Sequence, residues 1–184
     1  MKDKFTAYIG RRESGKTTRL YNIFVEEYKK HQRILVIDSA TDHVSKSLIK
    51  RIAREYDHEF IFTDEETKIF DFASKKKNFL NQFVQDANKQ VYLCDAGYFL
   101  ELGYKYPPGN ERERKRRLYK CFSMQVIMIL LDNVDVILMD EIEMLPEFYL
   151  PLKLVFSKEK KLFLALHDEK GLFGVKDLFY LERM

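Results

Sequence analysis

Residues 10–17 read Gly-Arg-Arg-Glu-Ser-Gly-Lys-Thr, and they satisfy the pattern GxxxxGK[ST]. An apolar segment, Phe5–Ile9, comes directly before them and predicts a strand, and helical spacing begins at about Lys16. Average residue frequencies put a chance match to this pattern in such a chain below about one per cent. A strand, a glycine-containing loop and a helix in this order indicate an α/β domain.

The residue types in this loop suit it to bind phosphate. Gly10 and Gly15 allow backbone angles that a side chain disfavours, so that backbone N–H groups can turn inward toward an anion. The start of the following helix adds the positive end of its dipole. We expect Lys16 to reach the β- and γ-phosphates, Thr17 to bind Mg²⁺ and Thr18 to contact the α-phosphate. The predicted nucleotide-contacting residues are Gly10, Arg11, Arg12, Glu13, Ser14, Gly15, Lys16, Thr17 and Thr18. For Arg11 and Arg12, simple solvation is the open alternative.

Short apolar segments rich in β-forming residues recur along the whole chain. They are Phe5–Ile9, Ile34–Ile37, Phe60–Phe62, Val91–Leu93, Val134–Met139, Leu162–Leu166 and Leu178–Leu181. Longer segments with helical spacing separate most of them, including the apolar faces of residues 20–28 and 79–87. Strands that are apolar along their length are typical of a sheet with helices on both faces. The pattern predicts a three-layer α/β fold with a mostly parallel central sheet.

Two carboxylates, Asp140 and Glu141, directly follow the apolar segment Val134–Met139. A buried strand that ends in this way resembles a Walker B motif, in which Asp140 holds Mg²⁺ and Glu141 polarises the attacking water. Asp95 also follows a predicted strand, and either a second contact to Mg²⁺ or a turn at the end of the strand explains it, the turn being favoured. Asp38 is a similar case, for which a role facing the site stays open.

Together, the loop and the acidic pair resemble P-loop NTPases with an additional strand and a catalytic glutamate, which include ABC, AAA+, RecA-like and DNA-packaging ATPases. The resemblance implies that Lys16 and Glu141 are catalytic and that ATP and Mg²⁺ are bound. The last third of the chain is similar to ABC-type ATPases, which implies that His167 touches the γ-phosphate. A histidine that ends a strand without contacting nucleotide is the alternative. The ABC signature is absent, so a transport function is not carried over.

Length and composition limit the remaining choices. The 184 residues predict a single domain over 1–184, with a lid or interaction insertion at about 96–117 around Pro107, Pro108 and Gly109. The net charge of +3 does not by itself mark a nucleic-acid binder. Cys94 and Cys121 lack CxxC spacing and are expected to be reduced, buried thiols. With no leader sequence and no apolar run long enough to span a bilayer, we expect a cytoplasmic protein without a membrane span.

A basic run, Arg112–Arg117, begins a segment that has the features of a helix start. Three interpretations stay open: a solvated face, an arginine finger for a neighbouring subunit, or a patch that contacts nucleic-acid phosphates.

These features favour an ATPase whose hydrolysis drives or switches a partner protein or self-assembly into a homo-oligomer. A nucleoside or nucleotide kinase is one alternative, in which residues 104–117 form the lid. A DNA-stimulated motor or packaging-type ATPase is another, and a protein that binds ATP without appreciable turnover is a third. The Asn-Lys-x-Asp element of common GTPases is absent from the sequence, which favours ATP over GTP.

Overall fold

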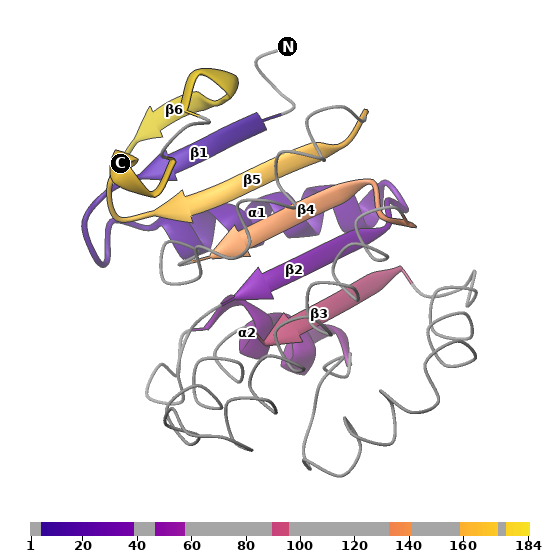
Figure 1. Ribbon diagram of the computed structural model, residues 1–184. Helices are drawn as coiled ribbons and strands as arrows, with labels where there is room; N and C mark the ends of the chain where they lie inside the picture. Colours follow the sequence, from indigo (N-terminus) through magenta and orange to yellow (C-terminus); the bar gives the residue numbers. More distant parts are fainter. Residues whose placement is uncertain (1–4, 39–46, 58–89, 96–132, 141–158, 173–175) are drawn as a thin grey trace, which may run out of the picture.

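The computed structural model describes residues 5–38, 47–57, 90–95, 133–140, 159–172 and 176–184 (Figure 1). The elements in chain order are β1 (Phe5–Ile9), α1 (Lys16–Lys29), β2 (Ile34–Asp38), α2 (Leu48–Tyr56), β3 (Val91–Asp95), β4 (Val136–Asp140), β5 (Lys161–Leu166), the 3₁₀ turns η3 (Glu169–Leu172) and η4 (Lys176–Leu178), and β6 (Tyr180–Arg183).

The described strands form one parallel sheet in the order β3-β2-β4-β5-β1-β6. All of their carboxyl ends therefore lie at the same edge of the sheet (Figure 1). The predicted α/β class is confirmed, and the sheet is parallel throughout its described strands. Strand β5 lies between β1 and β4, so the strand that leads into the loop and the strand that ends in Asp140 are not direct neighbours.

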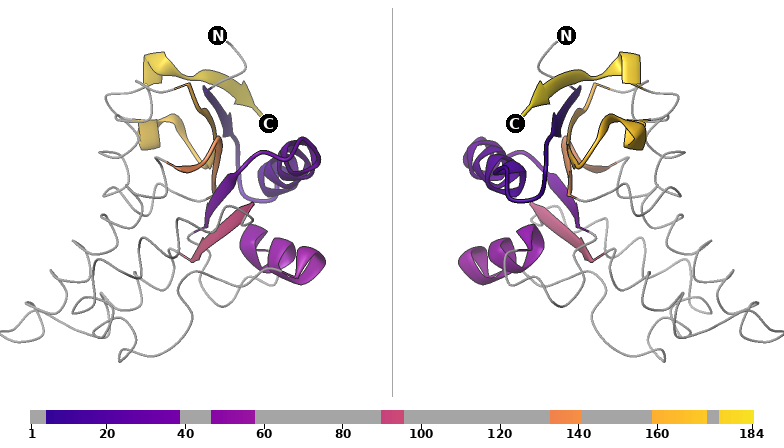
Figure 2. Two further views of the ribbon diagram at one scale, coloured as in Figure 1. Left: turned by 90° about the vertical axis from the view of Figure 1, so that its right-hand side faces the viewer. Right: turned by 90° about the vertical axis from the view of Figure 1, so that its left-hand side faces the viewer.

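The central strands are buried along their length, as their uninterrupted apolar sequences predict. Every residue of β2 and β4 is buried. Helices α1 and α2 both pack on the same face of the sheet (Figure 2). The helix predicted over residues 79–87 and the strand predicted at Phe60–Phe62 lie outside the described residues, as does the layer expected on the other face.

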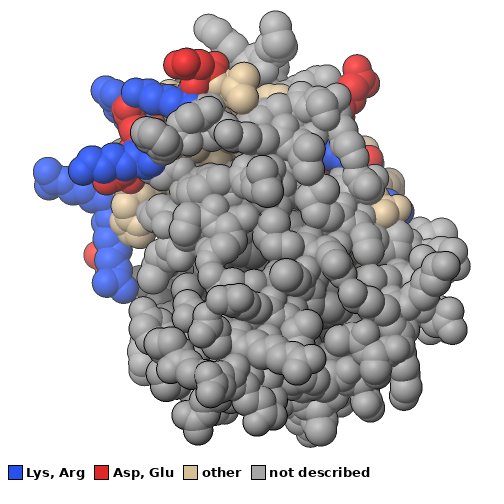
Figure 3. All heavy atoms as spheres, in the orientation of Figure 1, with Lys and Arg blue, Asp and Glu red and all other residues tan. Residues whose placement is uncertain are grey.

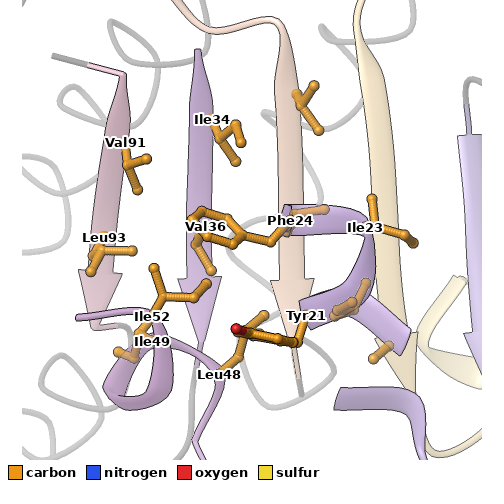
Figure 4. Packing of buried hydrophobic residues seen from close by; sticks show 14 of the residues in the cluster. Tyr21, Ile23, Phe24, Ile34, Val36, Leu48, Ile49, Ile52, Val91 and Leu93 are labelled. Carbon is orange, nitrogen blue, oxygen red and sulfur yellow. The ribbon is translucent and has the colours of Figure 1, made fainter. Parts of the chain in front are cut away.

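The core between α1, α2 and the sheet includes the predicted apolar face of α1, together with residues of α2 and of the strands. Leu20, Ile23 and Phe24 are buried, and Phe24 lies above Val36 of β2 (Figure 4). The half-buried Tyr28 stacks on Phe24 with ring centroids 5.6 Å apart. Burial of a large apolar side chain contributes about 1.5–3 kcal/mol, so burial of Phe24 against β2 stabilises the packing of α1 on the centre of the sheet.

Polar contacts fix α1 at both of its ends. Near its carboxyl end, the buried carboxylate of Glu27 accepts hydrogen bonds from Lys161 Nζ of β5 at 2.8 Å and from Lys30 Nζ at 2.9 Å. Nearer its start, the hydroxyl of Tyr21 donates to Glu55 of α2, and the guanidinium of Arg51 lies 3.4 Å from the centroid of the Tyr21 ring. Both the sheet and the second helix therefore position the helix that follows the loop.

Strands β4 and β6 each begin two residues later than the sequence predicted. Strand β4 begins at Val136 rather than Val134, and just before it the Asp135 carboxylate accepts the Arg33 amide at 2.8 Å. Strand β6 begins at Tyr180 rather than Leu178, because the Phe179 amide donates to the Lys176 carbonyl oxygen and continues the turn of η4. Among the described helices, none is long and apolar enough to cross a bilayer.

Candidate functional site

The loop of residues 10–15 leaves the carboxyl end of β1 beside β5. The Gly10 amide donates to the Leu166 carbonyl oxygen at 3.2 Å, so the loop starts in contact with the end of β5. The Ser14 amide donates to the Arg11 carbonyl oxygen at 3.2 Å and closes a tight turn. Glu13 has φ 65° and Gly15 has φ 95°. Gly15 therefore has the left-handed angle that the sequence predicted, whereas the prediction was wrong for Gly10 and the second left-handed residue of the loop is Glu13.

The start of α1 leaves backbone donors for a ligand. Gly15 is the N-cap and has no side chain that could accept their hydrogen bonds, and the first turn holds no acidic residue. The first N–H groups of a helix have no partner within the helix, and its dipole places partial positive charge there. An anion at this position would satisfy these groups.

The ammonium group of Lys16 lies inside the loop. Its Nζ donates to the carbonyl oxygens of Gly10 at 2.7 Å and Arg11 at 2.8 Å, and it lies 3.5 Å from Ser14 Oγ. The residue is only 6% exposed. A buried ammonium is costly unless it is hydrogen-bonded, and here the loop's own oxygens supply the partners. A phosphate would offer this group full negative charge in place of carbonyl dipoles.

Thr17 and Asp140, predicted as metal ligands, lie in direct contact. Thr17 Oγ1 donates to Asp140 Oδ2 at 2.7 Å, although 123 positions separate the two residues in the sequence. Asp140 is 4% exposed at the end of β4. A hydroxyl and a carboxylate are hard oxygen ligands of the kind Mg²⁺ prefers. Mg²⁺ is usually held by one or two protein oxygens together with phosphates and water, so this pair fits the ion.

Two further strand-end residues, Asp38 and Asp95, lie in register with Asp140. Asp38 of β2 pairs with Asp140 on one side and with Asp95 of β3 on the other. The buried carboxylate of Asp38 accepts from Ser47 Oγ at 2.9 Å and from the Ile49 amide at 3.3 Å. Asp38 therefore binds the first turn of α2, a contact that its position at a strand end did not predict. The side chain of Asp95 lies outside the described residues.

His167 emerges between the loop and Asp140. It directly follows β5, in which Leu166 pairs with Ile9 and Ala165 pairs with Asp140. Its side chain is exposed. The backbone thus brings His167 to the carboxyl edge of the sheet beside the loop, where the resemblance requires a γ-phosphate contact.

The other predicted residues of the loop differ in how exposed they are, and several further predictions lie outside the described part of the chain. Arg11, Arg12, Glu13 and Thr18 are exposed, whereas Ser14 and Gly15 are half-buried. Outside the described residues lie Glu141, Cys121 and the insertion at about 96–117, which includes Arg112–Arg117.

One residue at the loop was missed by sequence reasoning. The Met184 amide donates to the Ile9 carbonyl oxygen at 2.8 Å and continues the pairing of β6 with β1. A Cβ placed on Gly10 would lie 2.7 Å from the main-chain oxygen of Met184, and one placed on Gly15 would lie 3.8 Å from its Cε. The predicted strand near residue 180 was the only available signal, and it does not reveal which strand it pairs with.

Charged groups surround the β6 edge of the site. Most of the described Lys and Arg side chains visible in Figure 3 lie with acidic ones at the upper left, on the side where Figure 1 draws the ends of β1 and β6. Glu169 of η3 binds Lys176 and, at 2.6 Å, Arg183. The pKa of Glu169 is lowered by its hydrogen bond with Lys176 and then by that with Arg183. These contacts tie η3 and η4 to the end of β6.

Comparisons with known proteins support the fold. No family model and no curated protein sequence matches the chain. The structure is similar to that of the genome packaging NTPase B204 from Sulfolobus turreted icosahedral virus 2 in complex with AMP, with a TM-score of 0.50 and 14% sequence identity. That match covers 92% of this chain and 67% of the viral chain. The complex of B204 with ATP-gammaS gives a TM-score of 0.41 at 15% identity, covering 92% and 66%. The first of these matches shows that the α/β fold is one found in an NTPase.

Proposed function

We propose that this chain is a Mg²⁺-dependent ATPase of the P-loop type, with residues 10–18 binding the triphosphate. The hydrogen bond between Thr17 Oγ1 and Asp140 Oδ2 carries the proposal. It joins the hydroxyl that ends the loop motif to the carboxylate that ends β4, which is the pair required to hold a metal ion beside the bound phosphates.

The described residues divide the work of binding between them. The first N–H groups of α1 bind phosphate oxygens, and Lys16 exchanges the Gly10 and Arg11 carbonyl oxygens for oxygens of the β- and γ-phosphates. Thr17 and Asp140 hold Mg²⁺, which when bound neutralises charge on the phosphates. His167 donates to the γ-phosphate, and Glu141 orients the attacking water.

The strand order supports assignment to the class with an additional strand and a catalytic glutamate. In that class a strand is inserted between the P-loop strand and the Walker B strand, and β5 has this position between β1 and β4. We further propose that residues 1–184 form one such domain, with the insertion at about 96–117 serving as a lid or interaction segment.

Hydrolysis is tested by phosphate release from Mg·ATP. Lys16→Ala and Asp140→Asn are expected to lower the rate at least 100-fold, because each removes a group that meets charge in the transition state. Lys29→Ala, at an exposed lysine of the same helix, is the matched control and should keep the wild-type rate. Label appearing in a nucleoside or nucleotide acceptor instead of free phosphate would replace this proposal with the kinase alternative.

A packaging-type motor is the second candidate, favoured by the similarity to a genome packaging NTPase. On this proposal, double-stranded DNA raises the rate of ATP hydrolysis, and raising salt from 50 to 200 mM suppresses the increase. A variant with Arg114, Arg116 and Arg117 changed to glutamine should lose the stimulation and keep the basal rate. A DNA-independent rate at low salt would remove this candidate and leave the ATPase proposal standing.

A further inference from the structure

Met184 is an exposed apolar residue placed directly against the loop. Its side chain is 43% exposed, yet its amide is held by the Ile9 carbonyl oxygen at 2.8 Å. Its Cε lies 3.8 Å from the Cβ position of Gly15, the N-cap of α1. A flexible thioether is therefore held at the mouth of the loop with one side open to solvent.

The position of the metal-binding pair sets the direction in which a nucleotide must lie. Thr17 and Asp140 bind at the β4 side of β1, and β5 with His167 lies between β4 and β1. Strand β6 pairs with β1 on the opposite side (Figure 1). A nucleoside triphosphate is a linear molecule with its γ-phosphate at one end and its base at the other. When the γ-phosphate lies toward Asp140, the base leaves the loop toward β6.

The other exposed apolar residues of this segment lie farther from the loop. Leu178 and Tyr180 are 51% and 47% exposed. Tyr180 pairs with Thr6, whereas Arg183 pairs with Ile9, immediately before the loop. At about 3.3 Å per residue, Tyr180 is roughly 10 Å further down the sheet than Arg183. Of these three, Met184 is the one within reach of a molecule bound in the loop.

We propose that Met184 forms the floor of a subsite for the base of a nucleoside triphosphate, with its thioether against the flat face of the ring. This inference rests on the proposed function and extends it from the phosphates to the base. A thioether is polarizable and packs favourably against aromatic rings. It has little capacity to hydrogen-bond to the edge of a base. The contact therefore adds affinity without distinguishing adenine from guanine.

The test compares two probes, Mg·ATP and Mg·tripolyphosphate, by isothermal titration calorimetry of the full chain. Met184→Ala keeps the main-chain amide that binds Ile9, and it should weaken ATP about 3- to 10-fold while leaving tripolyphosphate unchanged. Leu178→Ala is the matched control and should change neither affinity. Circular dichroism of both variants checks that β6 remains folded.

The possible outcomes separate this inference from the proposed function. If the wild-type chain binds both probes equally tightly, or if Met184→Ala leaves ATP affinity intact, the base subsite is wrong and the phosphate site stands. If Met184→Ala weakens both probes alike, the residue shapes the loop and does not contact the base. If the wild-type chain binds neither probe, both proposals are overturned.

Discussion

Substituting Gly10 by alanine tests how tightly the end of β6 is seated against the loop. A Cβ at this position would lie 2.6 Å from Ser14 Oγ, 2.7 Å from the main-chain oxygen of Met184 and 3.2 Å from Ser14 Cβ. Gly10 is not among the residues with positive φ, so the effect is steric and not a matter of backbone strain. Ser14 can rotate its hydroxyl away, but the Met184 oxygen belongs to the backbone.

The cost follows from the shift that the contact demands. Carbon–oxygen contacts normally begin at about 3.4 Å, so the Met184 oxygen must move by roughly 0.7 Å against the hydrogen bond between its amide and Ile9. Overpacking of this size costs typically 1–3 kcal/mol, and for this single contact we expect about 1–2 kcal/mol. For a domain of this length that lowers Tm by roughly 2–8 °C.

Urea denaturation followed by circular dichroism measures this change. In the Gly10→Ala background, Ser14→Gly should recover only the part of the loss caused by Ser14 and leave the part caused by Met184. A change in the free energy of unfolding below about 0.5 kcal/mol for Gly10→Ala would refute the reasoning, because it would mean that β6 yields freely at the loop.

Three further predictions concern α1 and the loop that precedes it. Thr17→Val removes the donor to the buried Asp140 carboxylate and should lower the free energy of unfolding, measured in urea, by about 1.5–3 kcal/mol. Thr17→Ser keeps a hydroxyl and should match the wild type. Equal losses of stability in the two variants would contradict this reasoning. Burial raises the pKa of Glu27, but hydrogen bonds from Lys161 and Lys30 outweigh it and lower the pKa below 4.5. The charged carboxylate therefore stabilises the fold fully above about pH 4.5, and this contribution is lost as pH falls through the lowered pKa, so Glu27→Gln should be destabilised at pH 7 and the gap to the wild type should narrow as pH falls below 4.5. A gap that stays equal below pH 4.5 would argue against it. Glu13 has φ 65°, so Glu13→Gly should raise Tm by a few degrees through relief of about 1 kcal/mol, while Glu13→Ala should not; identical Tm values would count against strain at this residue.

Local sequence patterns were sufficient to predict the parts of the fold that depend on local chemistry. The strand Phe5–Ile9 and the helix from Lys16 follow from apolar spacing and from the glycines between them; the strand has the predicted bounds and the helix begins at the predicted residue. The fold class followed because uninterrupted apolar strands must be covered by helices. Six of the seven predicted strands correspond to β1, β2, β3, β4, β5 and β6, with shifts of one or two residues at most ends.

Features that depend on which strands are neighbours could not be predicted in the same way. Asp38 and Asp140 look alike in sequence, since each ends an apolar strand, but Asp38 binds Ser47 at the start of α2 whereas Asp140 binds Thr17 at the start of α1. The difference arises because α2 begins beside the end of β2, whereas α1 begins beside the end of β4. Met184 was missed for the same reason, because its contact with the loop depends on β6 pairing with β1 and nothing in the local sequence encodes that pairing.

The strand order also has a consequence for biosynthesis. Among the described strands β1 leaves the ribosome first, yet its two neighbours in the sheet, β5 and β6, come from residues 161–183. Contacts of such large sequence separation form slowly, because a long chain must be closed before they contribute any stability. A nascent chain therefore carries the proposed phosphate-binding loop for more than 140 residues before β1 can join its partners in the sheet. On the proposed function, nucleotide cannot assist the early stages of folding, and it would stabilise the molecule only after translation has delivered the strands beside the loop.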